Sequence, residues 1–328
     1  MSIEGLKEAL FNSAPQHFHE LALQLFRYQA AHVPVYQAYI RQLKIQPERI
    51  MHIKEIPFLP VRFFKSHAVY DHDQPRPQLY FESSGTTGQI PARHEIADPA
   101  IYETSFTKGF IQRWGQPSDY CILGLLPSYL ERSNSSLVYM VKHLMDRSGH
   151  PLNGFYLHDH QKLWRTLKQL EGEGQATLLF GVTYALLDFA EDFPIQLQHT
   201  MIIETGGMKG RKHEMTRDEV HDQLKRQFAL QQIYSEYGMS ELLSQAYTLA
   251  DGRFACPPWM KLLVRDINDP FDIQSSGRGA INIIDMANLY SCSFLATEDV
   301  GEVFLDGHFI IQGRMDDSEI RGCSLMSI

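Results

Sequence analysis

The feature that most constrains the fold is an alternation of short apolar runs with helix-forming segments across the middle of the chain. The apolar runs predict buried strands at Leu79–Phe81, Cys121–Leu126, Thr177–Phe180, Met201–Ile203 and Gln232–Tyr234. Helices are expected at Ser135–Met145, at Tyr184–Phe189 and from Thr216, where Glu219 completes a capping box. Alternation of this kind favours an α/β fold with helices on the faces of a sheet.

The flanking regions follow other patterns. Apolar residues recur at helical spacing over Phe18–Phe26, and Tyr36–Leu43 can form a second helix. Ile56–Phe64 contains two prolines and is expected to be an extended connector packed on the core. Beyond Trp259, shorter β segments are expected at Met260–Val264, Ala280–Ile284 and Val303–Gln312, the last interrupted by Asp306-Gly307. These patterns predict a helical N-terminal region (1–70), a core (71–312) and a C-terminal hinge and tail (313–328).

The bulk composition limits the classes of function. The formal net charge is −9 at pH 7, which is the opposite of what a mainly nucleic-acid-binding protein shows. An anionic substrate would therefore need backbone amides or a few placed cations. The sequence lacks a signal-peptide pattern and an apolar run long enough to span a membrane. Its 4 cysteines have no zinc-site spacing, so we expect a cytoplasmic protein with reduced thiols.

The sharpest local signal is a run of small and hydroxylated residues directly after a predicted strand, Ser83-Ser84-Gly85-Thr86-Thr87-Gly88. Glycines permit tight turns, so successive backbone N–H groups can point at one anion, and the hydroxyl groups add donors. The run is therefore typical of a phosphate-binding loop. It is neither a Walker loop nor a dinucleotide fingerprint, because neither spacing is present. Taken alone, it is equally typical of a flexible polar loop.

Three further segments carry groups suited to a nucleotide. Tyr237 can stack on a purine, and Glu241 is a hard carboxylate that can hold Mg²⁺. Asp299, two residues before a glycine that we expect to form a turn, can accept hydrogen bonds from both ribose hydroxyls. A Gly-Arg-Met-Asp-Asp run from Gly313 predicts a charged turn. Each of the three, taken alone, is also typical of an ordinary surface turn.

Together, and in this order, the four segments resemble the adenylate-forming superfamily of acyl-CoA synthetases, peptide-synthetase adenylation domains and luciferases. The closer resemblance is to LuxE-type acyl-protein synthetases and the related phenylacetate-CoA ligases. The segments that carry it are Ile56–Lys65, Ser128–Arg132, Glu204–Gly210 and Glu236–Gln245. The resemblance implies an α/β fold: the large N-terminal domain of an adenylate-forming enzyme, with helix-flanked sheets and a small β subdomain, lacking the usual C-terminal lid domain.

The resemblance also implies roles for individual residues, with ATP and Mg²⁺ as the cofactors. The β- and γ-phosphates would be held by Ser83, Ser84, Gly85, Thr86, Thr87 and Gly88. The adenine would be framed by Gly206, Gly207, Tyr237 and Gly238. The α-phosphate and Mg²⁺ would lie beside Ser240 and Glu241, with Glu241 as the metal ligand. Asp299 would bind the ribose, and Arg314 would close over the nucleotide.

Two departures from the family pattern affect the expected chemistry. The Pro-Lys that usually follows the phosphate loop is replaced by Ile90–His94, and the sequence ends six residues after Gly322. Most adenylating enzymes continue for about a hundred residues, the size of a small domain. In that family the lid supplies a catalytic lysine, so adenylation here is expected to use Mg²⁺, the phosphate loop and a local cation, which could be Lys209, Arg211 or Arg314. LuxE-type enzymes accept the acyl group on a cysteine near the C-terminus, which implies Cys323, whose neighbouring arginine would raise its nucleophilicity.

The expected activity is ATP-dependent conversion of a carboxylic acid to acyl-AMP, followed by acyl transfer to Cys323 and then to a partner protein, a reductase or a carrier. Apolar residues near the motifs predict a fatty or aryl acid: Phe180, Val182, Tyr184, Leu242 and Trp259. Two alternatives stay open. One is an acyl-CoA or acyl-carrier-protein ligase without a covalent acyl-enzyme. The other is a non-catalytic nucleotide-binding subunit.

Overall fold

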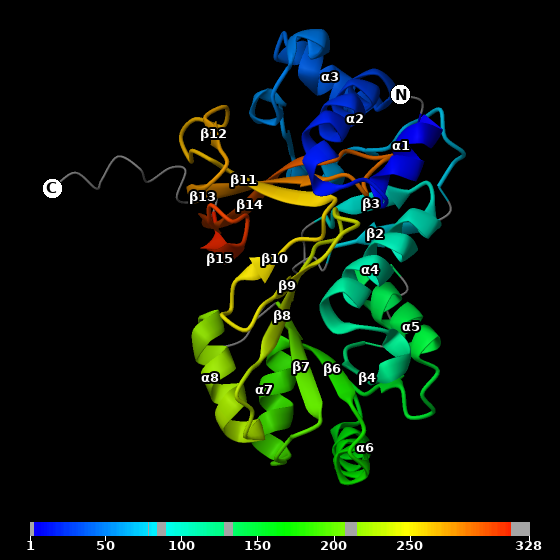
Figure 1. The fold of residues 1–328 in the computed structure, drawn as a ribbon, viewed down its shortest axis with the longest axis vertical. Helices are drawn as coiled ribbons and strands as arrows, with labels where there is room; N and C mark the ends of the chain where they lie inside the picture. Colours follow the sequence, from blue (N-terminus) through cyan, green and yellow to red (C-terminus); the bar gives the residue numbers. More distant parts are fainter. Residues whose placement is uncertain (1–2, 78, 84–89, 128–133, 207–214, 316–328) are drawn as a thin grey trace, which may run out of the picture.

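The computed structural model describes residues 3–77, 79–83, 90–127, 134–206 and 215–315. Within these residues, the strands form one 13-stranded sheet and a separate two-stranded hairpin of β2 and β3. The N-terminal helices gather at one end of the molecule, and the later helices surround the other end of the large sheet (Figure 1).

The helices and strands have the following bounds. The α-helices are α1 (Ile3–Leu10), α2 (Phe18–His32), α3 (Pro34–Gln42), α4 (Pro99–Trp114), α5 (Ser136–Ser148), α6 (His160–Glu173), α7 (Thr183–Asp192) and α8 (Arg217–Phe228). The 3-10 helices are η1 (Pro15–His17), η2 (Pro47–Arg49), η3 (Ile53–Glu55), η4 (Val61–Lys65) and η5 (Pro117–Asp119). The strands are β1 (Leu59–Pro60), β2 (Leu79–Glu82), β3 (Arg93–Ile96), β4 (Cys121–Leu125), β5 (Gly154–Phe155), β6 (Thr177–Val182), β7 (Thr200–Thr205), β8 (Tyr234–Tyr237), β9 (Ala246–Thr248), β10 (Phe254–Ala255), β11 (Met260–Arg265), β12 (Ile273–Gln274), β13 (Gly277–Asp285), β14 (Phe294–Val303) and β15 (Phe309–Arg314).

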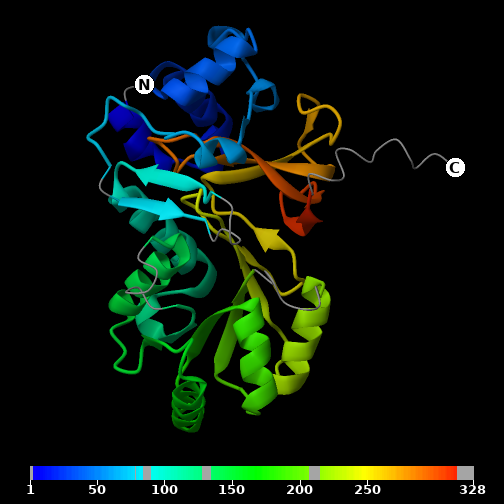
Figure 2. The same cartoon turned by 180° about the vertical axis from the view of Figure 1, so that it is seen from behind.

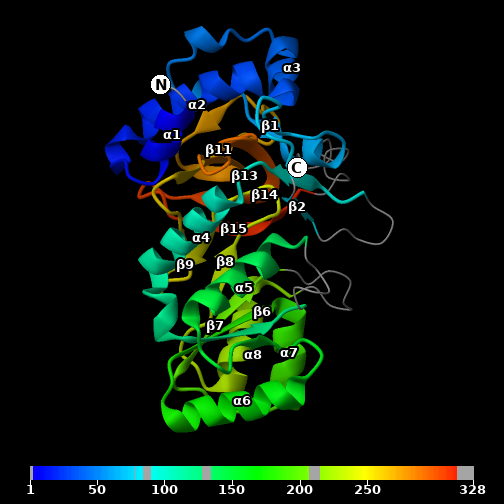
Figure 3. The same ribbon diagram turned by 90° about the vertical axis from the view of Figure 1, so that its right-hand side faces the viewer.

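One half of the large sheet is parallel. Strands β5, β4, β6, β7 and β8 lie in this order, and each adjacent pair is parallel. In β6, Leu178 and Phe180 join the core that contains α4 and α5, whereas Leu179 joins the core of α6, α7 and α8. Helices therefore cover both faces of this half, which Figure 3 shows from the side. The central strands β4 and β6 are almost entirely apolar, because neither of their faces meets water.

The other half of the sheet is antiparallel. Its strands follow the order β12, β11, β13, β14 and β15, and β10 and β9 continue the sheet to β8. The N-terminal helices cover this half, as the view from behind shows (Figure 2). Phe26 of α2 and Tyr36 of α3 pack on Phe294 of β14, with ring centroids 5.9 and 6.2 Å from it.

Most of the predicted strands are confirmed. The strands expected at Leu79–Phe81, Cys121–Leu126, Thr177–Phe180 and Met201–Ile203 are β2, β4, β6 and β7. The strand predicted at Gln232–Tyr234 is misplaced, because β8 is Tyr234–Tyr237. The strand contains polar residues, so a search for apolar runs does not find it. Neighbouring strands provide their hydrogen-bond partners: the hydroxyl of Ser235 donates to Glu204 of β7 at 3.1 Å.

The helix predictions are also largely confirmed. The segments around Ser135–Met145 and Tyr184–Phe189 are α5 and α7, and the capping box of Thr216 and Glu219 opens α8. The connector Ile56–Phe64 is extended only as far as β1, because η4 begins at Val61. Helices α4 and α6 were not expected from the sequence. None of the described helices is long and apolar enough to cross a membrane.

Candidate functional site

The candidate site begins where the adjacent parallel strands β7 and β8 end. Thr205 pairs with Glu236, so Gly206 and Tyr237, the next residues along, lie at the same edge of the sheet. Ligands of α/β sheets bind outside the carboxyl ends of the strands. Gly206 is exposed, and a Cβ atom added to it would have no heavy atom within 4 Å. The edge beside Gly206 therefore has room for a bound group.

Three predicted site residues from three strands meet through direct hydrogen bonds. Tyr237 of β8 donates its hydroxyl to Oδ2 of Asp299 in β14 at 2.7 Å. Arg314 of β15 donates from Nε to Oδ1 of the same carboxylate at 3.0 Å. The Asp299 side chain is 6% exposed and the Arg314 side chain 61%, so the guanidinium forms the solvent side of the group. Burial and the charge of Asp299 raise the pKa of Tyr237 well above its usual value.

Asp299 lies inside a strand, which corrects the expectation of a turn at Gly301. Strand β14 continues to Val303, and its register against β15 shifts between Val300 and Gly301. A Cβ atom at Gly301 would lie 2.1 Å from the carbonyl oxygen of Ile310. The glycine is therefore required by the close approach of β15, at a bulge just after Asp299.

Ser240 and Glu241 lie in the loop after β8, and both are buried. The Ser240 hydroxyl donates to Oε2 of Glu241 at 2.9 Å, and the Asn288 side chain donates to the Glu241 carbonyl oxygen at 2.8 Å. Burial raises the pKa of Glu241, and the Ser240 hydrogen bond and the charges of Arg314 and Lys65 partly offset this. The carboxylate therefore lies in the field of two cations from distant parts of the chain.

The surroundings of Glu241 fit a Mg²⁺ ion. Mg²⁺ prefers oxygen ligands, keeps several waters and is typically bound by one or two carboxylates together with substrate phosphates. A cation against Glu241 would offset the burial that raises the pKa of this carboxyl. Asp299 is less suited to a metal, because the guanidinium of Arg314 already balances its charge at 3.0 Å. Glu241 is therefore the residue that would hold the ion.

His94 of β3 joins the Ser240 loop to the β2–β3 hairpin. Its Nδ1 lies 2.9 Å from the Ser240 carbonyl oxygen, and Nδ1 carries the proton because a carbonyl only accepts. Its Nε2 is buried and has no partner among the described residues. Burial lowers the pKa of His94 to about 4, so the ring is neutral at pH 7. Ser83 and Ala92 close the end of the same hairpin, with Ser83 N donating to Ala92 O at 3.0 Å and Ala92 N to Ser83 Oγ at 2.9 Å.

Glu236 is a carboxyl group at the site to which sequence reasoning gave no role. It is partly buried, and burial followed by the charge of Glu204 raises its pKa to about 8. A Cβ atom on Gly238 would lie 2.4 Å from Oε1 of Glu236, so this side chain folds over the glycine. Strongly shifted carboxyl groups concentrate at functional sites. The only signal in the sequence was a charged residue inside the predicted nucleotide motif.

The structure does not place every predicted residue. Outside the described residues lie Ser84, Gly85, Thr86, Thr87, Gly88, Gly207, Lys209, Arg211 and Cys323. Of the apolar residues expected to receive the acid, Phe180, Leu242 and Trp259 are buried in the core. Val182 pairs with Thr205 at the carboxyl end of β6, and Tyr184 follows it. Only these last two lie at the edge of the sheet where the site begins.

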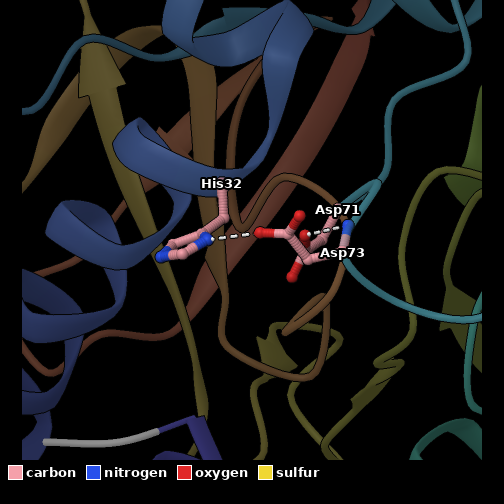
Figure 4. Close-up of side chains that lie close together, drawn as sticks. All are labelled: His32, Asp71 and Asp73. Carbon is pink, nitrogen blue, oxygen red and sulfur yellow. Dashed lines mark hydrogen bonds and ion pairs between the residues drawn. The ribbon is translucent and has the colours of Figure 1, made fainter.

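Another cluster of possible metal ligands lies at the end of α2 (Figure 4). His32, Asp71 and Asp73 bring one ligand atom each within 4.8 Å of one another. Nδ1 of His32 is 2.9 Å from Oδ2 of Asp73. Asp71 is fully buried and accepts from Tyr28, from the side chain of Gln74 and from the Asp73 amide. These bonds tie α2 to the segment after η4, which is a structural role.

Comparisons with known proteins agree with this fold. No protein-family model and no curated protein matches the chain. A 2-hydroxyisobutyryl-CoA ligase, solved in an open conformation with 2-HIB-AMP and CoA, matches with a TM-score of 0.64 and 13% identity, over 94% of this chain and 78% of that one. A long-chain-fatty-acid-CoA ligase from Archaeoglobus fulgidus matches with a TM-score of 0.52 and 15% identity, over 76% of this chain and 53% of that one. The fold is therefore that of the N-terminal domain of adenylate-forming enzymes, and the match spans about half the length of the fatty-acid ligase.

Proposed function

We propose that this protein activates a carboxylic acid with ATP, forming an acyl-adenylate and releasing pyrophosphate. The observation that carries the proposal is the meeting of Tyr237, Asp299 and Arg314 beside the open strand ends at Gly206. Segments far apart in the sequence supply an aromatic ring, a carboxylate suited to a ribose and a cation at one place. The fold likeness to two CoA ligases is consistent with this chemistry.

In the proposed reaction, a carboxylate oxygen of the acid attacks the α-phosphorus of ATP. The bond between that phosphorus and the bridging oxygen breaks, and pyrophosphate leaves with the electron pair. Asp299 would accept hydrogen bonds from the ribose hydroxyls, Tyr237 would pack on the adenine, and Arg314 would stabilise the phosphate charge. Glu241 would hold Mg²⁺, which supplies further positive charge to the phosphate oxygens when bound. The loop from Ser83 to Gly88 would bind the β- and γ-phosphates.

For the second step we infer transfer to Cys323, as in LuxE-type enzymes. Its thiolate would attack the acyl carbonyl carbon, a thioester would form, and AMP would leave. The described cysteines favour this assignment because none is an activated thiol. Burial raises the pKa of Cys121 and Cys292 to about 12, and it raises the pKa of Cys256 as well. A thiol needs a lowered pKa to be an effective nucleophile at neutral pH. A reductase or carrier protein would then take the acyl group.

A second candidate is a CoA or acyl-carrier-protein ligase without a covalent acyl-enzyme. The names of the two matching structures favour it, because both are CoA ligases. In that case AMP formation would depend on the added thiol. A fatty or aryl acid remains the proposed substrate under both candidates, because the partly buried Val182 and Tyr184 lie beside the strand ends.

The test is pyrophosphate release with Mg·ATP and a panel of fatty and aryl acids, followed by intact mass spectrometry of the protein. We expect release with at least one acid and an added acyl mass that Cys323→Ser abolishes and Cys256→Ser retains. Release that needs CoA and leaves the protein mass unchanged would favour the second candidate. ATP binding without release, for every acid with and without CoA, would contradict both candidates and indicate a non-catalytic nucleotide-binding subunit.

A further inference from the structure

Segment Ile56–Lys65 reaches from the N-terminal helices to the candidate site, and its last residue has no role in the reaction described above. Its strand β1 pairs in parallel with β14. Arg62 follows, and its Nη2 lies 3.6 Å from Oε1 of Glu298, the neighbour of Asp299. One side of η4 is therefore attached to the strand that carries Asp299.

The other side of η4 is attached to the loop that carries Glu241. Phe64 is buried and packs edge-on against the ring of His94, with centroids 5.2 Å apart and an interplanar angle of 81°. His94 in turn holds the Ser240 carbonyl oxygen at 2.9 Å. Residue 65 is thus positioned from two directions, by the strand of the proposed ribose carboxylate and by the loop of the proposed metal ligand.

Lys65 follows Phe64 and is exposed. Two other cations of this region already form ion pairs with carboxylates: Arg93 pairs with Glu95 at 2.7 Å, and Arg62 pairs with Glu298. Lys65 makes no ion pair with any carboxylate in the described part of the chain. It directly follows Phe64, whose contact with His94 attaches η4 to the Ser240 loop. The segment attached to the loop of the proposed metal ligand therefore carries a cation with free hydrogen-bonding capacity.

We propose that Lys65 binds the phosphate oxygens of the nucleotide. The inference rests on the proposed function, because it takes the site to hold ATP. A lysine suits this task, since its ammonium group is a compact charge with three donors on a flexible stem, and charge-assisted hydrogen bonds to phosphate are strong. The anchored η4 brings that stem toward the site, and Arg314 of β15 donates to Asp299 there. Two cations from opposite ends of the chain would then share the phosphate charge.

The experiment compares Mg·ATP and adenosine binding to the full-length protein by calorimetry. The variants are Lys65→Gln, Lys65→Arg and, as a matched control, Lys54→Gln, which removes an exposed lysine in the same region. We expect Lys65→Gln to weaken ATP binding roughly 10- to 100-fold, as loss of a charged hydrogen bond does. Adenosine carries no phosphate, so its affinity should stay within about 2-fold. Lys65→Arg should retain most of the ATP affinity, and Lys54→Gln all of it.

Each outcome decides a different claim. Wild-type protein that binds neither ligand would overturn the proposed function and this inference together. Wild-type protein and Lys65→Gln with equal ATP affinity would overturn only the role of Lys65. Equal losses for ATP and adenosine in Lys65→Gln would also overturn it, because a phosphate contact cannot weaken adenosine binding. A loss confined to ATP and restored by arginine would support it.

Discussion

The hydroxyl of Tyr237 donates to Asp299 at 2.7 Å, so one hydrogen bond joins the last parallel strand, β8, to the antiparallel strand β14. Arg314 of β15 donates to the other oxygen of the same carboxylate at 3.0 Å. The two halves of the sheet are therefore linked by side chains at the place where the proposed nucleotide would bind. A single carboxylate joins the two halves of the sheet, and under the proposed function it would also accept hydrogen bonds from the ribose, because each of its oxygens keeps a second lone pair.

Asp299→Asn should weaken adenosine and ATP binding alike. The amide keeps the shape of the side chain, but it loses the charge that holds Arg314 and replaces one acceptor with a donor. Loss of a charged hydrogen bond costs about 1.5–3 kcal/mol, so we expect a 10- to 100-fold rise in Kd for both ligands by calorimetry.

The control for this variant is Asp306→Asn. Asp306 also pairs with an arginine, Arg253, at 2.9 Å, but in the exposed turn between β14 and β15. Its replacement should leave both affinities unchanged. Asp299→Asn with wild-type adenosine affinity would refute a role for this carboxylate in nucleotide binding.

His94 should make stability fall in mild acid. Burial lowers its pKa from 6.5 to about 4 in the folded protein. The unfolded chain takes up a proton below about pH 6.5, whereas the folded protein does so only near pH 4, so unfolding is favoured increasingly as the pH falls through this range. Between pH 7.5 and 4.5 the free energy of unfolding should fall by about 2–3 kcal/mol from this group. Urea unfolding between pH 4.5 and 7.5 would measure it.

Two substitutions separate the charge of His94 from its hydrogen bond. His94→Asn keeps a donor near the position of Nδ1 and cannot titrate, so its stability should change less with pH than that of the wild type. His94→Ala leaves the Ser240 carbonyl oxygen without this partner and should cost about 1–3 kcal/mol at pH 7. Parallel pH profiles for wild type and His94→Asn would show that the ring does not titrate as described.

The sequence predicted the elements whose signal is local. The apolar runs that became β4, β6 and β7 are buried on both faces, so a short window of sequence contains the evidence. Strand β8 was misplaced because Ser235 and Glu236 are polar, and their burial depends on partners in other elements. Helix α4 was missed, although the cap at Asp98 followed by proline was a usable start signal.

In the candidate site, too, residues with a local sequence signal could be predicted, whereas contacts between distant segments could not. Tyr237, Glu241 and Asp299 could be named in advance because each belongs to a short motif with its own chemistry. The contact of His94 with Ser240 spans 146 positions, and no pattern in either segment predicts it. The placement of Lys65 likewise depends on β1 pairing with β14. Such contacts arise from tertiary packing, which the spacing of residues along the chain does not encode.

Glu236 should act on stability in the opposite direction to His94. Its pKa is raised from 4.5 to about 8 in the folded protein, chiefly by burial. Between these values the unfolded chain loses a proton that the folded protein keeps, so stability falls as the pH rises from about 4.5 to about 8. Glu236→Gln should be more stable than the wild type at pH 8, by up to a few kcal/mol, and similar to it at pH 5. A difference that is independent of pH in urea unfolding would contradict the raised pKa.

Gly301 should be among the least replaceable residues near the site. A Cβ atom there would lie 2.1 Å from the backbone oxygen of Ile310, a position that no side-chain rotation can relieve. Gly301→Ala must therefore separate β14 from β15 at the bulge beside Asp299, and we expect a loss of about 1–3 kcal/mol or more. Gly313, which pairs with Val300 across the same two strands, has no heavy atom within 4 Å of its Cβ position. Gly313→Ala is thus the matched control and should change stability by less than about 1 kcal/mol.

Because the bulge positions Asp299 against Arg314, Gly301→Ala should also weaken adenosine binding, while Gly313→Ala should not. Equal urea midpoints for the two variants would mean that the close approach of the strands is not maintained in solution.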